Sequence, residues 1–151
     1  MTTTTLTTPT AAPVASLDVT AGTAAETVAS AFSAVRKLPF AEQVEYLLGS
    51  VGPRITAAGA GLRDARQLAT WRKGEAPREE LRLDKVAALA EIAASVMAIY
   101  PAAVAASFLR SSQPALDDDS PLLLIRDAAQ EEDLVEVMGR VRSALRAFLD
   151  G

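Results

Sequence analysis

The sequence predicts an all-α protein, a compact multi-helix domain preceded by a disordered N-terminal arm. Apolar residues recur at intervals of three and four along most of the chain, as in amphipathic helices. We find no segment with the alternation of a half-buried strand and no internal repeat. Half of the 151 residues are hydrophobic, which is enough for one sizeable core. We expect three segments, 1–22, 23–80 and 81–151.

Composition excludes several kinds of chemistry. The chain has no cysteine and no histidine, so disulfides, thiolate or imidazole metal sites and histidine-assisted nucleophiles are ruled out. The net charge is −4, but the charges are sorted by segment. Residues 53–73 carry five basic residues and one acid, whereas residues 111–151 carry four basic residues and nine acids. Basic and acidic surfaces are therefore expected on different parts of the protein.

The arm, residues 1–22, is rich in threonine, alanine and proline and has few large apolar residues to offset the entropy of ordering. It lacks the pattern of a secretory signal, so we expect a cytoplasmic protein. Thr23 and Glu26 form a capping box that predicts a first helix to about Lys37. Pro39 opens a second helix, which we expect to end near Gly49 or Gly52.

Two short helices follow, across a glycine turn. We assign the first to Arg54–Ala58, the turn to Gly59–Gly61, and the second to Asp64–Lys73, with Asp64 as its cap. Leu68 and Trp71, three apart, are predicted to face inward against the first helix of the pair.

The remaining helices are predicted from periodicity, prolines and caps. A long helix begins near Leu81, its apolar stripe reaches Ile99, and Pro101 breaks or kinks it before a further helix to Arg110. Residues 111–119 form a loop, and Ser120 with Pro121 starts a short helix to Arg126. The last helix runs from about Gln130, with acids first and arginines later.

The pair of short helices has the character of a DNA-binding helix-turn-helix. Such a motif presents the early, outward residues of its second helix to base edges. Arg66, Gln67 and Thr70 are predicted to point outward, and arginine and glutamine are able to make bidentate contacts to guanine and adenine. At the ends of the helix we expect phosphate contacts from Arg63, Arg72 and Lys73.

Leu68, Trp71, Gly74 and Glu75 occupy the places of the V-x-x-W-x-x-G-E ending of the recognition helix in phage-repressor-like (Xre) regulators. The motif therefore resembles an Xre-like helix-turn-helix. The glycines of the turn lie slightly farther from the helix than usual in that pattern.

A second resemblance lies in residues 108–127. This segment is similar to the toxin-binding domain of the Xre/MbcA/ParS antitoxin family, whose signature runs W-L-x-x-P-N-x-x-L-x-G-x-x-P-x-x-L-L. Phe108 stands for the tryptophan, Leu109 and Leu116 for the leucines, Pro121 for the second proline, and Leu124 with Ile125 for the closing pair. Ser112 and Gln113 replace the proline and asparagine, with Pro114 just after them. Asp118 replaces the glycine, and aspartate tolerates a left-handed backbone better than most residues.

The resemblance implies an antitoxin that represses its own promoter and covers the active site of an NAD-consuming RES-domain toxin. The chain itself would then be no enzyme and would need no cofactor or metal. The expected partner-binding residues are Pro114, Leu116, Asp117, Asp118, Pro121, Arg140, Arg142 and Arg146. Acids such as those of the loop suit a basic entrance on a nucleotide-binding enzyme. We also expect a homodimer and no membrane association.

Three other hypotheses about the function stay open. One is a stand-alone helix-turn-helix regulator that uses its C-terminal region for dimerisation or another partner. Another is an enzyme that uses carboxylates such as Glu42, Glu45 or Glu91, although we expect these to be exposed helix charges. The third is a structural adaptor without DNA binding. The run Asp117–Asp119 invites a metal interpretation, but it lacks the ligand spacing and distal glutamate of an EF-hand.

Overall fold

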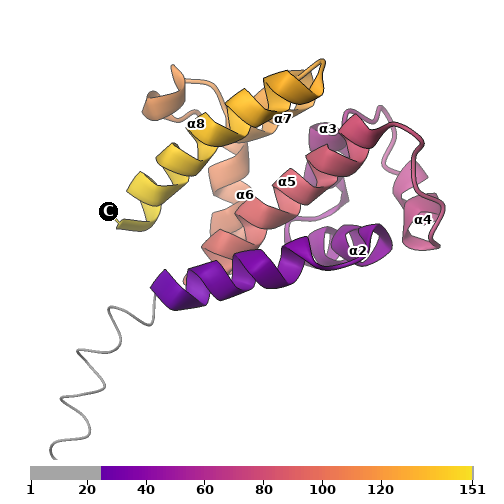
Figure 1. The fold of residues 1–151 in the computed structure, drawn as a ribbon, viewed down its shortest axis with the longest axis horizontal. Coiled ribbons are helices and arrows are strands. Elements are labelled where there is room, and N and C mark those ends of the chain that lie inside the picture. The colour runs from indigo at the N-terminus through magenta and orange to yellow at the C-terminus, as the bar shows by residue number, and fades with distance from the viewer. Residues whose placement is uncertain (1–24, 151) are drawn as a thin grey trace, which may run out of the picture.

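The computed structural model describes residues 25–150 and places helices in most of this range (Figure 1). Residues 25–36 are helical. The helices that follow are α2 (Phe40–Ser50), α3 (Pro53–Ala60), α4 (Gln67–Arg72), α5 (Glu80–Met97), α6 (Ala102–Arg110), the 3₁₀ turn η1 (Pro114–Leu116), α7 (Pro121–Asp127) and α8 (Glu131–Asp150). The all-α prediction is confirmed. The predicted arm and the cap at Thr23 lie outside the described residues.

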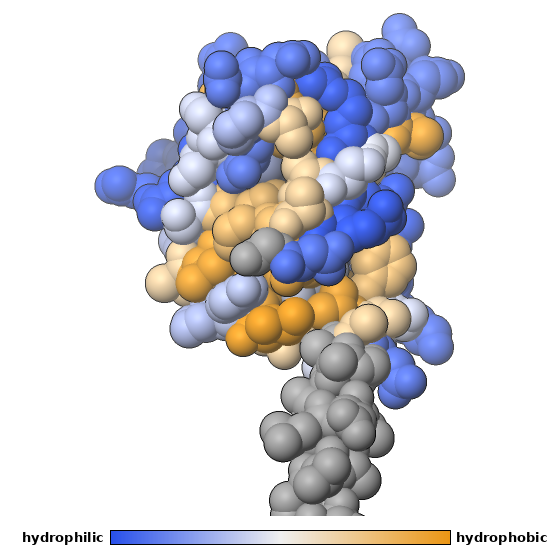
Figure 2. Space-filling view, turned by 90° about the vertical axis from the view of Figure 1, so that its left-hand side faces the viewer, coloured by the Kyte–Doolittle hydropathy of each residue, from blue (hydrophilic) through white to orange (hydrophobic). Residues whose placement is uncertain are grey.

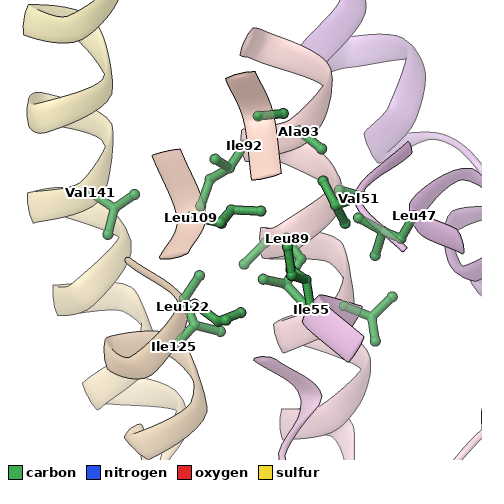
Figure 3. Close-up of a cluster of buried hydrophobic side chains, with 14 of the residues drawn as sticks. Leu47, Val51, Ile55, Leu89, Ile92, Ala93, Leu109, Leu122, Ile125 and Val141 are labelled. Atoms are coloured by element: carbon green, nitrogen blue, oxygen red, sulfur yellow. The ribbon is translucent and has the colours of Figure 1, made fainter. Parts of the chain in front are cut away.

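Helix α5 is the centre of the fold. It packs against α2, α3, α6, α7 and α8, and every residue from Ala88 to Val96 is buried. The small alanines of α5 let these neighbours approach closely. Figure 3 shows side chains from the neighbouring helices converging on Leu89 and Ile92, among them Leu47, Leu109 and Val141. The predicted segments 23–80 and 81–151 therefore share one hydrophobic core.

Local sequence signals locate several helix ends. The Ser120 hydroxyl accepts a hydrogen bond from the backbone N–H of Leu123 at 3.2 Å, with Pro121 as the first residue of α7, as predicted. The break at Pro101 is also confirmed, because α5 ends at Met97 and Pro101 directly precedes α6. Ile99 thus lies beyond the helix whose apolar stripe it was expected to continue, and its side chain is exposed.

The turn after the first short helix begins two residues later than predicted, because α3 ends at Ala60 and not at Ala58. Gly59 lies inside α3, and the turn is made by Gly61, whose φ of 80° lies in the left-handed region. A Cβ on Gly59 would lie 2.6 Å from one terminal carbon of Leu89. Gly59 is therefore used for close packing between α3 and α5. None of the helices within residues 25–150 has the length and apolar character required to cross a bilayer.

Candidate functional site

Helix α4 is anchored to the protein by two buried side chains. Leu68 and Trp71 face inward, as predicted, and the Trp71 ring packs edge-on against Phe40 at a centroid distance of 5.3 Å. Phe40 is the first residue of α2, and α4 packs mainly on α2. The inward-facing residues of α4 were predicted correctly, but their main neighbour is α2 and not the first short helix of the pair.

Asp64 holds the backbone segment that leads into α4. Its carboxylate accepts hydrogen bonds from the backbone N–H of Arg66 at 2.8 Å and from the Arg66 Nε at 2.7 Å. The bond from the Arg66 side chain, followed by that from its backbone, lowers the pKa of Asp64. Residues 65 and 66 form a turn, so α4 begins at Gln67, three residues later than predicted for this helix. Arg66 and Gln67 thereby stand at the beginning of α4.

The predicted DNA-contacting residues are all exposed, but they differ in whether their side chains already have a partner within the protein. Gln67 and Thr70 face solvent, and the side chain of Arg66 is 92% exposed although it pairs with Asp64. Arg72 is held by Glu45 of α2 through bonds of 2.6 and 3.1 Å. The remaining two basic residues, Arg63 and Lys73, form no ion pair with any residue between 25 and 150.

The C-terminal loop is closed by its own backbone hydrogen bonds. Gln113 N–H donates to Asp119 O and Asp118 N–H donates to Gln113 O, both at 3.0 Å. Asp117 and Asp118 adopt left-handed conformations, with φ of 57° and 64°. The second value confirms the conformation expected where aspartate replaces glycine. Both carboxylates are exposed, whereas Leu116 between the two ends of the loop is fully buried.

Helix α5 carries a buried carboxylate, that of Glu91. Glu91 is only 1% exposed, so the expectation of an exposed helix charge is wrong. It accepts two hydrogen bonds from Arg142, at 2.7 and 2.9 Å, and Arg36 lies 3.7 Å away. The bond to Glu91 raises the pKa of Arg142. This cluster ties α5 to α8 and to the first helix.

The predicted partner-binding residues therefore fall into three groups. Pro114, Asp117, Asp118 and Arg146 are exposed. Leu116 and Pro121 are buried and serve the packing of the loop and of α7. Arg140 pairs with Asp117 at 3.2 Å, and Arg142 is held by Glu91, so both arginines already have partners within the protein.

Two acidic residues, Asp84 near the beginning of α5 and Glu131 at the beginning of α8, lie side by side. A hydrogen bond with Asp84, followed by the negative charge of that residue, raises the pKa of Glu131. The two carboxyls line a pocket of about 240 Å³ together with Arg36 and Arg142. Asp84 and Glu131 lie far apart along the chain, so no local sequence pattern pairs them. Their types alone carry no signal for the contact.

The three carboxylates considered for catalysis have different surroundings. Glu42 is exposed, Glu45 holds Arg72, and Glu91 is buried against Arg142. Across residues 25–150 no three acidic side chains are grouped so that they could hold a metal ion, the aspartate run of the loop included.

Comparisons with protein-family models, with curated proteins and with solved structures found no match to this chain.

Proposed function

We propose that the chain is a DNA-binding transcriptional repressor of the antitoxin type, in which α4 reads base edges and the C-terminal region neutralises a RES-type toxin. One observation carries the DNA-binding part. Helix α4 is anchored from one side by buried Leu68 and Trp71, while Gln67 and Thr70 face solvent. A helix held from one side and exposed on the other is able to enter the major groove.

The charges around α4 support the same proposal. Arg63 and Lys73 flank the helix without ion-pair partners among the described residues, which suits them to phosphate contacts. The solvent-exposed pair between Arg66 and Asp64 is easily exchanged for a contact to a guanine edge. Arg72 is engaged with Glu45, so we assign it the role of holding α4 against α2 rather than that of a phosphate contact.

The exposed part of the C-terminal loop supports the toxin-binding part. Asp117 and Asp118 are exposed on a loop closed by backbone hydrogen bonds, so the loop backbone needs little ordering on binding. Asp117 pairs with Arg140 at the surface, a contact that contributes little stability and can be exchanged for a basic partner. A toxin that consumes NAD must bind phosphates, and a basic entrance on such an enzyme would complement this loop. In this proposal the chain is an inhibitor without catalysis of its own, and it acts in the cytoplasm.

The second candidate function is a stand-alone regulator that binds DNA but no toxin. It is favoured by the burial of Leu116 and Pro121 and by the contact between Arg142 and Glu91. These features mean that part of the predicted toxin-binding set is already used inside the protein. The two candidates share α4 and differ only in the partner of the C-terminal region.

Fluorescence anisotropy with the promoter DNA of the chain's own gene tests the DNA-binding part. We expect the wild-type protein to prefer this DNA to an unrelated duplex. Gln67→Ala should reduce that preference by about tenfold, since a bidentate base contact is worth about 1–3 kcal/mol. Gln130→Ala, at an exposed glutamine before α8, is the matched control and should change nothing. Equal affinity of the wild-type protein for both duplexes would contradict the DNA-binding part of the proposal.

Co-expression with the product of the neighbouring gene tests the toxin-binding part. We expect a stable complex and loss of toxicity with the wild-type chain. Asp117→Asn and Asp118→Asn remove the charges while keeping a residue that tolerates the left-handed backbone, so the loop should survive. Toxicity should return with the double variant. If DNA binding is present but no complex forms with the wild-type chain, the stand-alone regulator is correct.

A further inference from the structure

The pocket of about 240 Å³ between α5, α8 and the helix of residues 25–36 is lined by charges of both signs. Helices α5 and α8 lie side by side and run in the same direction (Figure 1). Asp84 and Glu131, near the beginnings of these helices, form an acidic end. Arg142, about three turns further along α8, forms a basic end together with Arg36. We call this cavity the two-charge pocket.

The acidic end carries negative charge that the protein itself does not neutralise. The hydrogen bond between Glu131 and Asp84, followed by repulsion from Asp84, Glu80 and Glu132, raises the pKa of Glu131. Among residues 25–150, no lysine or arginine forms an ion pair with any of these acids. A cation bound at this end would relieve the repulsion.

The basic end keeps hydrogen-bond donors that the protein does not use. Arg142 donates to Glu91 through Nε and Nη2, and its Nη1 donates to no residue that the structure describes. Arg36 approaches Glu91 only to 3.7 Å, which is too long for a hydrogen bond. Both arginine side chains are half-exposed, at 42% and 44%. A ligand carboxylate could therefore accept hydrogen bonds from both guanidinium groups.

The wall between the two ends is apolar and sets the length of a ligand. Ala88, Leu134 and Met138 line it and are buried in the core. Both arginines are held near Glu91, which follows Asp84 by about two turns of α5, so the two ends lie about 10 Å apart. A charge-assisted hydrogen bond of about 2.8 Å at each end leaves about 5 Å between the charged groups of a ligand.

We propose that the two-charge pocket binds a small linear ω-amino acid, with the ammonium group at the acidic end and the carboxylate at the basic end. A chain of about four to six carbons spans the remaining distance, whereas an α-amino acid carries both charges on one carbon and is too short. The volume is below the roughly 300 Å³ at which sites for drug-sized ligands begin. An uncharged apolar ligand would find more hydrophobic surface on the face at which α8 ends (Figure 2). This proposal does not depend on DNA or toxin binding.

An NMR titration of the full chain with δ-aminovalerate tests the proposal. We expect a Kd of about 1 mM or tighter, as two charge-assisted contacts would supply, with shifts of the backbone amides of Ala88, Leu134 and Met138. Two matched compounds are norvaline, the α-amino isomer, and valerate, which lacks the ammonium group. Each can make only one of the two charged contacts at full strength, so each should bind about tenfold more weakly or worse.

Variants at each end of the pocket make the test specific. Glu131→Gln should weaken binding about tenfold although it stabilises the folded protein at neutral pH, and Arg36→Gln should weaken binding by a similar factor. The matched controls are Glu136→Gln on α8 and Lys37→Gln beside Arg36, both exposed and outside the pocket, and they should bind as the wild type does. No binding of δ-aminovalerate at millimolar concentration, equal binding of norvaline, or equal losses in the pocket and control variants would overturn the proposal.

Discussion

Alanine at Gly59 would test the packing of α3 on α5. An ideal Cβ at this position would lie 2.6 and 2.8 Å from the terminal carbons of Leu89 and 3.0 Å from one of Leu122. Both leucines are buried in the core shown in Figure 3, so neither moves away without displacing other core side chains. Overpacking of this kind costs about 1–3 kcal/mol.

Gly139 in α8 provides the matched control, because a Cβ there would meet nothing within 4 Å. Inside a helix, replacing glycine by alanine stabilises the folded state by about 1 kcal/mol. This gain applies to both glycines, so the difference between the two variants isolates the overpacking. We expect Gly139→Ala to raise the free energy of unfolding and Gly59→Ala to lie about 1–3 kcal/mol below it.

Urea unfolding followed by circular dichroism measures both values. Leu89→Ala alone should cost about 2–5 kcal/mol by creating a cavity. Combined with Gly59→Ala, it frees the space that the new methyl group needs, so the double variant should lose less than the sum of the single losses. Equal stabilisation by the two glycine substitutions would refute the close approach of α3 to α5.

Two further predictions concern the ion pairs of α8. Arg142→Met should lower the free energy of unfolding by about 3 kcal/mol, because it strips buried Glu91 of its bidentate partner, whereas Arg140→Met breaks only a surface pair and should cost less than about 1 kcal/mol. Urea unfolding of both variants checks this, and equal losses would contradict it. Glu131 has a raised pKa beside Asp84, so the folded state binds more protons and loses stability as the pH rises from the ordinary glutamate pKa through the raised one. Glu131→Gln should therefore be more stable than wild type at neutral pH, and this difference should disappear in acid. Thermal melts at several pH values measure it, and a difference that is the same at every pH would contradict the interaction of Glu131 with Asp84.

The fold could be predicted largely because its signals are local. The cap at Ser120 and the break at Pro101 depend on residues next to each other in the sequence. The inward side of α4 follows from the three-residue spacing of Leu68 and Trp71, which needs no knowledge of the rest of the protein. Gly59 was misplaced because a glycine needed for close packing and one needed for a turn look the same in a sequence.

The candidate sites were harder to predict because their charges are paired over long distances. Arg72 binds Glu45 across 27 positions, and Arg142 binds Glu91 across 51. Periodicity reports which side of a helix faces the core, but it does not report which cation reaches a given acid. The sequence therefore identified the exposed side of α4 and did not distinguish its engaged arginine from its free cations.

The salt dependence of DNA binding tests the central claim most directly. Each phosphate contact that is lost should reduce the slope of log affinity against log salt concentration by about 1. We predict this reduction for Arg63→Ala and for Lys73→Ala, and an unchanged slope for Arg146→Ala on α8, an exposed arginine far along the chain from α4. Unchanged slopes for Arg63→Ala and Lys73→Ala, or an equal reduction for all three variants, would contradict the assignment of α4 as the DNA-reading helix.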